Sequence, residues 1–187
     1  MTQTHGPGSG EDGAADPATV PAPDGDEITA FWQLARGRAG LDRLAVIVGS
    51  GAGASVPPPA WSFADTPDEA DRQLARVLDR TRTATAVARC ELDDAGEPLP
   101  QPGDLSIVVD GRGHPRALLR TTEVRTVRFA DVDAEHARLE GEGDGTLASW
   151  TAAYAPRFAE AAARTGRTAG PDLEVVLERF EVRYPTR

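Results

Sequence analysis

The chain has 187 residues, and its 30 acidic and 20 basic side chains give a formal net charge of −10 at pH 7. This length fits one domain with a tail, and no stretch approaches the ~18 apolar residues of a membrane-spanning helix. The acidic surface disfavours bulk binding of DNA or RNA through phosphates, although a local basic cleft is still allowed, and the lone thiol of Cys90 excludes an internal disulfide and fits the cytoplasm.

Residues 1–26 contain almost nothing that could fill a core. They consist mainly of Gly, Pro, Asp, Ala, Thr and Ser, and Val20 is their only large aliphatic residue after Met1. Such a segment cannot bury enough apolar area to offset its chain entropy. It also lacks the basic start and apolar run of a signal peptide. We therefore predict a disordered low-complexity tail over residues 1–26 and one domain over residues 27–187.

The first ordered element is predicted to be a helix from Asp26 to Arg38, with Asp26 as its N-cap. Apolar residues follow at helical spacing, namely Ile28, Phe31, Trp32 and Ala35. Residues 49–60 are rich in Gly and Pro, which predicts a loop. We expect this first helix to pack through its apolar stripe.

The segment Thr66-Pro67-Asp68-Glu69 has the pattern of a capping box with proline at the first helical position. In that arrangement Thr66 accepts a hydrogen bond from the backbone of Glu69, and the Glu69 side chain reaches back. Apolar residues then recur on one face: Ala70, Leu74, Val77 and Leu78. This pattern predicts a helix over residues 67–79.

From residue 83 the apolar period changes from helical to alternating, which is typical of strands. Strands are predicted at residues 83–90, 105–109, 117–122, 124–129 and 173–184. Residues 110–113 supply a hairpin turn, and a change of register near Glu178–Arg179 predicts a bulge. Helices are predicted at residues 131–139 and 146–160. We therefore expect an α+β fold built on a small, partly closed β-barrel of five or six strands with flanking helices.

Several segments taken together resemble the ASCH domain family. In chain order they are Trp61–Asp65, Arg82–Ala86, Leu99–Asp104, Glu135–Asp144 and Leu177–Phe180. The glycine-spaced acidic segment within 135–144 is the most specific of them. The resemblance covers residues 27–184 and implies a PUA-like barrel. It also implies RNA or a modified nucleoside as the ligand, held in a cleft beside the barrel.

In one branch of this family the members resemble amidohydrolases that release acetate from 4-acetylcytidine, and other relatives are described as ribonucleases. The amidohydrolase pattern has a lysine as proton acceptor, a threonine as nucleophile and a glutamate as proton donor. The resemblance places these roles on Arg82, Thr85 and Glu140. The sequence also departs from the pattern at Thr151 and Tyr154, where an arginine and a histidine are expected.

Arg82 alters the chemistry of this site. A guanidinium has a pKa above ~12 and cannot accept a proton as a lysine amine can, although its planar fork can bind a phosphate or a carbonyl. We therefore interpret Arg82 as a ligand-binding residue. Arg82→Lys should raise turnover only if the cleft lowers the pKa of the new amine. Thr85 can equally be an ordinary β-branched strand residue, because a hydroxyl needs a neighbouring base to act as a nucleophile.

The acidic segment leaves two further alternatives open. Alternating carboxylates at Glu140, Glu142 and Asp144 suit a hard cation, but the intervening glycines and a helix cap at Asp144 explain the pattern without a metal, so we expect none. His136 lies one helical turn before Glu140 and could serve as a base, although such a histidine is more often structural. Glu140 itself is a candidate acid or ligand contact.

Two functions follow from these residues. One is a binding module that holds RNA or a modified nucleoside with at most weak hydrolysis, and the other is a hydrolase of the amidohydrolase or ribonuclease type. Neither requires a cofactor, a membrane or DNA, and the oligomeric state stays open. We expect Arg82, Thr85 and Glu140 to converge on one concave surface. This cleft should be less acidic than the rest of the chain, with Arg120 or Arg125 contributing.

Overall fold

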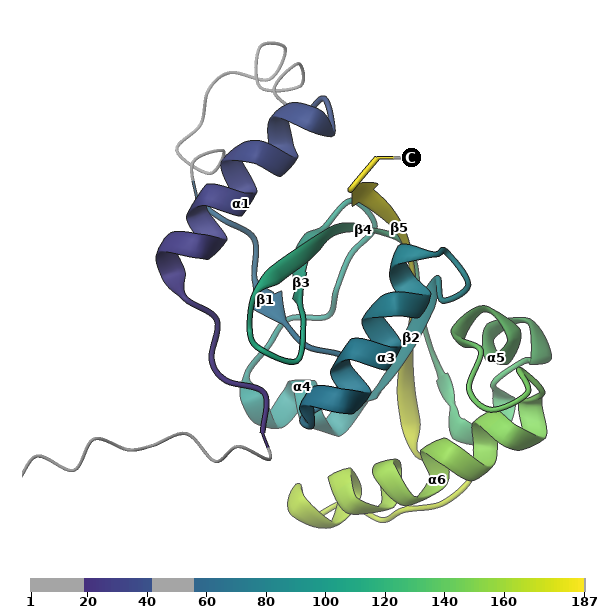
Figure 1. Ribbon diagram of the computed structural model, residues 1–187. Helices are drawn as coiled ribbons and strands as arrows, with labels where there is room; N and C mark the ends of the chain where they lie inside the picture. The colour runs from purple at the N-terminus through teal and green to yellow at the C-terminus, as the bar shows by residue number, and fades with distance from the viewer. Residues whose placement is uncertain (1–18, 42–55, 187) are drawn as a thin grey trace, which may run out of the picture.

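The computed structural model describes residues 19–41 and 56–186 (Figure 1). The helices are α1 (Gly25–Arg38), α3 (Pro67–Leu78), α4 (Arg89–Ala95), α5 (Ala134–Glu140) and α6 (Leu147–Arg164), with a short 3-10 helix η2 (Phe129–Asp131). The strands are β1 (Ala60–Trp61), β2 (Ala84–Ala88), β3 (Leu105–Val109), β4 (Pro115–Arg128) and β5 (Glu174–Tyr184). None of the helices in these ranges is long and apolar enough to cross a membrane.

The strands form one five-stranded sheet in the order β1-β3-β4-β5-β2. The pair β1–β3 is parallel, and the other pairs are antiparallel. The α+β class is therefore confirmed. Because the ladder begins at β1 and ends at β2, hydrogen bonds do not close it among the described residues, which is compatible with a partly closed barrel.

Strand β4 is the centre of the sheet, and it corrects two details of the strand prediction. The two strands expected at 117–122 and 124–129 are one continuous strand. Its register against β5 shifts between Thr121 and Glu123, opposite Phe180 and Arg179. The predicted bulge therefore lies beside Arg179, close to where it was expected, but the extra residue belongs to β4 and not to β5. Because a bulge twists the paired ladder, the pattern of one strand located it without identifying which strand carries it.

Strands β3 and β4 are covered on both faces, as their alternating side chains require. Three of their residues pack with α1, namely Ile107, Val109 and Leu118. The residues of opposite parity pack with α3, namely Val108, Ala117 and Leu119. In Figure 1, α3 lies in front of the strands and α1 lies at their upper left. The predicted packing of the second helix against the sheet is confirmed.

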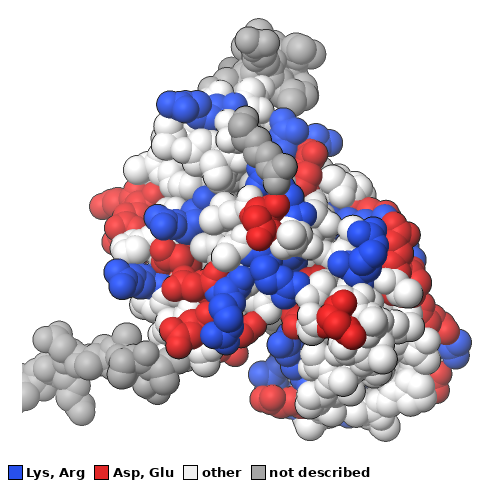
Figure 2. Space-filling model, turned by 45° about the vertical axis from the view of Figure 1, so that its right-hand side comes forward, with Lys and Arg blue, Asp and Glu red and all other residues white. Residues whose placement is uncertain are grey.

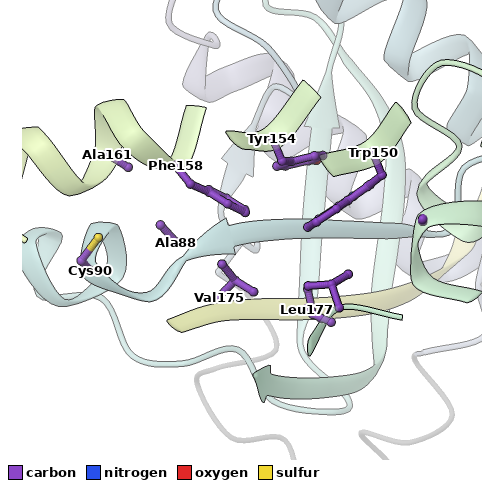
Figure 3. Packing of buried hydrophobic residues seen from close by; sticks show 10 residues of the cluster. Ala88, Cys90, Trp150, Tyr154, Phe158, Ala161, Val175 and Leu177 are labelled. Carbon is purple, nitrogen blue, oxygen red and sulfur yellow. The ribbon is translucent and has the colours of Figure 1, made fainter. Parts of the chain in front are cut away.

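The third core lies between α6 and the β2–β5 pair. Trp150, Tyr154 and Phe158 are four residues apart, so they share one face of α6 and pack against Val175 and Leu177 (Figure 3). The Trp150 and Tyr154 rings stack at 4.5 Å between centroids. This aromatic face holds α6 against the β2–β5 pair. Tyr154 and Phe158 also line a pocket between α6, α3 and β2.

The helix starts differ from the predictions. The N-cap of α1 is Asp24, whose side chain accepts from the backbone of Asp26 and Glu27. Helix α3 begins after Thr66 as predicted, but Thr66 makes no side-chain capping bond. The capping box is therefore wrong there, because the Glu69 side chain accepts from Arg72 and Gln73 instead.

Two boundaries also need correction. The predicted strand 83–90 ends at Ala88, where the short helix α4 begins, and Glu91 of that helix accepts from the Ala88 backbone. Within the tail predicted at residues 1–26, Val20 contacts the domain. Its N–H donates to the Asp65 carbonyl at 2.7 Å, and its side chain packs against the α1 core. The rest of the predicted tail, up to residue 18, lies outside the described residues, as does most of the loop predicted at 49–60.

Candidate functional site

A pocket of about 360 Å³ opens between the 62–65 loop, α3, β2 and α6. Its lining includes Arg82 and Thr85, together with Glu142 from the glycine-spaced acidic segment. Glu140 is not part of the lining. The structure thus brings the predicted residues into one region but divides them between the pocket surface and the layer beneath it.

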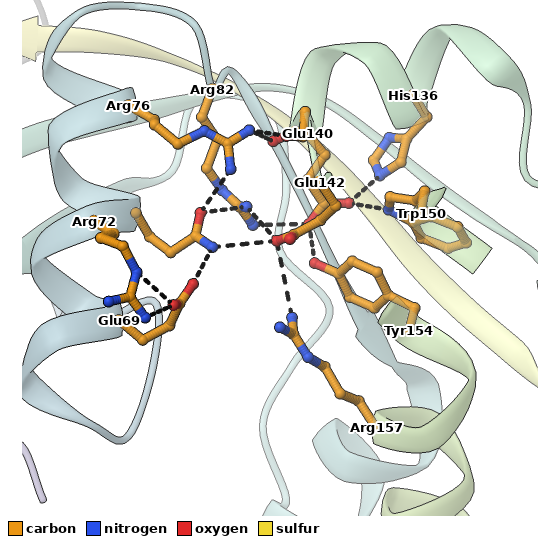
Figure 4. A network of polar contacts seen from close by, with 12 residues as sticks. Glu69, Arg72, Arg76, Arg82, His136, Glu140, Glu142, Trp150, Tyr154 and Arg157 are labelled. Atoms are coloured by element: carbon orange, nitrogen blue, oxygen red, sulfur yellow. Dashed lines mark hydrogen bonds and ion pairs between the residues drawn. The ribbon is translucent and has the colours of Figure 1, made fainter. Parts of the chain in front are cut away.

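Arg82 joins α3 to β2 and is the hub of this region (Figure 4). It is only 3% exposed, and its NH2 group donates to Glu140 Oε1 at 2.8 Å. Its NH1 group donates to Gln73 Oε1 at 2.9 Å and to Glu142 Oε1 at 3.1 Å. Burial lowers the Arg82 pKa, but the neighbouring negative charges, Glu140 first, outweigh burial and hold the pKa above its usual value. Arg82 therefore stays charged and is already bound within the protein.

Glu140 lies at the end of α5 and is completely buried. Besides Arg82, it accepts hydrogen bonds from the Trp150 indole N–H and the Tyr154 hydroxyl (Figure 4). Burial, reinforced by the Glu140 charge, raises the Tyr154 pKa well above its usual value. Tyr154 is therefore a neutral donor. Both oxygens of the Glu140 carboxylate thus accept hydrogen bonds. These bonds help to offset the cost of burying the charge.

His136 lies one turn before Glu140 on α5 and is also completely buried. Its Nε2 atom is 3.3 Å from Glu140 Oε2, but neither ring nitrogen makes a hydrogen bond with any described residue. The imidazole meets the Trp150 ring edge to face at 6.0 Å. His136 is absent from the pocket lining, so its position is that of a packed core residue next to the buried carboxylate.

The turn after α5 directs the acidic segment back toward α3. Gly141 has a φ of 68°, the left-handed conformation that lets a glycine end a helix. Arg76 of α3 donates to the carbonyls of Glu140 and Gly141, and a Cβ at Gly141 would collide with the Arg76 guanidinium. Arg76 therefore fixes the turn that places Glu142 in the pocket wall.

The three alternating carboxylates of this segment point to different surroundings. Glu140 is sealed and Glu142 lines the pocket, whereas Asp144 is exposed and accepts from Thr146 and from the Ser149 hydroxyl. These hydrogen bonds, the Ser149 bond first, lower the Asp144 pKa to about 2. Within residues 19–41 and 56–186 no group of three or more His, Cys, Asp or Glu side chains is placed to hold a metal ion.

Thr85 is half-buried on the edge strand β2 and lines the pocket. Its hydroxyl makes no hydrogen bond with another described residue. In the β2–β5 ladder Thr85 lies directly opposite Glu178, so the two side chains are on the same face of the sheet. Burial raises the Glu178 pKa, although a hydrogen bond from Thr121 opposes this shift. Glu178 is the titratable neighbour of Thr85 on its own sheet face.

The pocket is no less acidic than the whole chain, so the prediction of a locally less acidic cleft is wrong. Its lining carries five carboxylates and three guanidiniums: Asp65, Glu69, Glu91, Glu142, Glu160, Arg82, Arg157 and Arg164. Arg120 and Arg125 are not in the lining. Figure 2 shows acidic and basic side chains intermixed over one face of the molecule. The sequence suggested basic candidates from strand position alone, which cannot reveal where each side chain points.

Sequence reasoning missed three residues of the site. Gln73, Tyr154 and Arg157 all line the pocket, and Arg157 lies over the Tyr154 ring with 5.1 Å between the guanidinium carbon and the ring centroid. Two signals were available. Gln73 is a polar residue beside the apolar stripe of its helix, and Tyr154 is a position where the chain departs from the pattern that it resembles.

Comparisons with known proteins find a matching family and similar folds. The family model of the ASCH domain matches residues 59–184. The crystal structure of an ASCH domain from Lactobacillus crispatus JV V101 is similar, with a TM-score of 0.65 and 26% identity over 79% of this chain and 95% of that one. Protein EF3133 from Enterococcus faecalis V583 is also similar, with a TM-score of 0.69 and 28% identity over 84% of this chain and 88% of that one. No curated protein matches the chain.

Proposed function

The chain belongs to the ASCH domain family, and on that premise we propose that it binds a modified nucleoside, or a base of single-stranded RNA, with at most weak hydrolysis. The ligand would occupy the pocket between α3, β2 and α6. Its volume of about 360 Å³ is near the lower end of the roughly 300–1,000 Å³ typical of small-molecule sites. The site is therefore sized for one nucleoside rather than a folded RNA.

The observation that carries this proposal is the state of Arg82. Its guanidinium is clamped between Glu140 and Glu142, and its pKa is raised. A general base must be able to lose its proton near the working pH, and Arg82 cannot. Tyr154 is held as a neutral phenol and His136 lies outside the pocket, so neither supplies the missing base to a ligand.

The lining also supports binding of an isolated base more than of a polyanion. Phe63, Tyr154 and Phe158 contribute apolar surface to the lining, as is usual in sites that hold a small organic ligand. Carboxylates outnumber guanidiniums in the lining, so a phosphate backbone is repelled while an uncharged nucleoside is tolerated. RNA bases are commonly read when splayed out, by stacking and by contacts to their edges.

The hydrolase alternative has one observation in its favour. Thr85 lines the pocket and its hydroxyl makes no hydrogen bond with another described residue, and Glu178, which is not in the lining, lies across from Thr85 in the β2–β5 register. The raised pKa of Glu178 brings this carboxylate closer to the working pH, where a general base is most effective. If the protein hydrolyses an acylated nucleoside or RNA, we expect Thr85 as the nucleophile and Glu178 as its base.

One set of measurements separates the two functions. Calorimetric titration with cytidine, with 4-acetylcytidine and with a short single-stranded RNA measures binding, and acetate release and RNA cleavage measure turnover. We expect saturable nucleoside binding with product formation close to background. Robust product formation that disappears in both Thr85→Val and Glu178→Gln would establish the hydrolase instead. If none of the three probes binds, the proposed function is wrong.

A further inference from the structure

Glu142 combines deep burial with an oxygen that the protein does not use. The residue is 8% exposed and lines the pocket. The hydrogen bonds from Arg82 and Gln73 both end on its Oε1 atom. Oε2 accepts no hydrogen bond from the described residues. It is also not one of the side-chain atoms that are both inaccessible to solvent and without a hydrogen-bond partner. A carboxylate oxygen that is neither paired nor sealed faces the pocket as an acceptor.

Arg157 provides donors beside this acceptor. Its NH1 group is 4.0 Å from Glu142 Oε1, a distance that leaves it without a direct hydrogen bond there (Figure 4). Its guanidinium lies over the Tyr154 ring, which orients the plane, and its side chain is 51% exposed. No other described residue hydrogen-bonds this guanidinium, so its N–H groups are available at the pocket mouth.

Taken together, these positions set an acceptor and a donor next to each other on one wall. We propose that Glu142 and Arg157 determine ligand specificity, an inference that rests on the proposed function. They would recognise a base whose edge carries an N–H donor beside a carbonyl or ring-nitrogen acceptor. Glu142 Oε2 takes the N–H, and Arg157 donates to the acceptor. The fixed hydrogen bonds on Oε1 keep the carboxylate from rotating away. Glu142 is thus a positioning and recognition group rather than a proton carrier.

The other carboxylates of the lining do not meet these conditions. Glu69 is engaged by Arg72 and Gln73, and Glu91 by Arg164 and the Ala88 backbone. Asp65 and Glu160 are exposed, so water competes for their oxygens and weakens any selectivity. Glu142 alone in the described lining is both protected from water and open to the ligand on one oxygen.

The test compares cytidine with N4,N4-dimethylcytidine, which has no N–H on its exocyclic nitrogen. We expect the wild type to bind cytidine roughly ten- to a hundredfold more tightly, because the lost hydrogen bond involves a charged acceptor. In Glu142→Gln the amide oxygen keeps the Oε1 partners, so the amide NH2 takes the place of Oε2 and opposes an N–H donor. The preference should then fall to within about twofold. Glu160→Gln is the matched control in the same lining and should keep the wild-type preference.

Three outcomes are informative. A preference that survives in Glu142→Gln reflects the bulk of the methyl groups and overturns the inference, while the proposed function stands. Equal binding of both nucleosides by the wild type also overturns the inference and leaves the proposed function standing. No binding of either overturns the inference and the proposed function together. If Glu142→Gln does not fold, Arg157→Gln lies outside the buried network and should weaken cytidine about tenfold, and an unchanged affinity overturns the pair.

Discussion

Glu140 and Glu142 are two residues apart on one turn and share Arg82, yet they have opposite environments. Glu140 is completely buried and receives donors from Arg82, Trp150 and Tyr154. Glu142 has one engaged oxygen and lies in the pocket wall. The first is the electrostatic partner that keeps a buried arginine in place, and the second lines the pocket. Equal residue types at close spacing therefore say little about role until the donors around each carboxylate are known.

We expect the largest difference between Glu140 and Glu142 in how much each contributes to the free energy of unfolding. Glu140→Ala leaves Arg82 with one carboxylate and leaves the Trp150 and Tyr154 donors unpaired in the core. Breaking a buried pair in this way costs about 3–5 kcal/mol of unfolding free energy. Glu142→Ala leaves the Arg82–Glu140 pair intact and should cost less than ~2 kcal/mol. Urea unfolding of both variants measures the contrast, and equal losses would show that the two carboxylates are not different in kind.

Arg82→Lys probes what joins the two carboxylates. A lysine has its donors on one nitrogen and cannot span Glu140, Glu142 and Gln73 as the guanidinium fork does, so we expect a loss of about 2–3 kcal/mol. Two adjacent carboxylates also raise the pKa of the new amine. The condition under which this substitution was expected to raise turnover is therefore not met, and acetate release should stay at background. A clear gain in acetate release from a folded variant would contradict this.

Tyr154→Phe removes one donor from the sealed carboxylate and nothing from the open one. The hydroxyl bond to Glu140 is lost while the ring that faces Arg157 is kept. We expect unfolding free energy to fall by about 1.5–3 kcal/mol, the typical cost for a bond to a charged acceptor, with nucleoside affinity within about twofold of wild type. Thermal unfolding and calorimetry measure the two effects. An affinity loss larger than the stability loss would place the hydroxyl in the binding site.

Local signals in the sequence were sufficient for most of the fold. The α3 helix, strand β3 and the hairpin at 110–113 depend on neighbours in the chain, and their patterns predicted them correctly. The cap of α1 was missed because several neighbouring acidic residues could serve, and Asp24 is the one that accepts from the helix backbone. The capping box at α3 failed because Arg72 and Gln73, one turn further along the same helix, engage Glu69 in place of the backbone of Thr66.

The site was harder to predict because its geometry depends on contacts between distant segments. The resemblance brought Arg82 and Glu140 together across 58 positions, and they form a direct ion pair. It could not reveal that Glu140 is sealed, since the seal is made by Trp150 and Tyr154 of a different helix. Nor could alternation along β2 indicate that Thr85 would lie opposite Glu178, because that register is set by the pairing with β5.

The smallest expected effect concerns Glu178, a carboxylate with burial but few donors. It accepts from the Thr121 hydroxyl at 2.5 Å, and burial raises its pKa above the usual 4.5. A raised pKa means that the folded protein binds the proton more tightly than the unfolded chain. Stability therefore falls as the pH rises from the usual value through the raised one.

Glu178→Gln keeps an acceptor for Thr121 and removes this cost. We expect the variant to be more stable than wild type at pH 7 by on the order of 0.5 kcal/mol. The difference should vanish below about pH 4, where both states of the wild type are protonated. Urea unfolding from pH 3 to pH 8 measures it, with Glu160→Gln as an exposed control that should show no such trend. A variant that is less stable than wild type at pH 7 would mean that the Glu178 charge is satisfied in the fold, as that of Glu140 is.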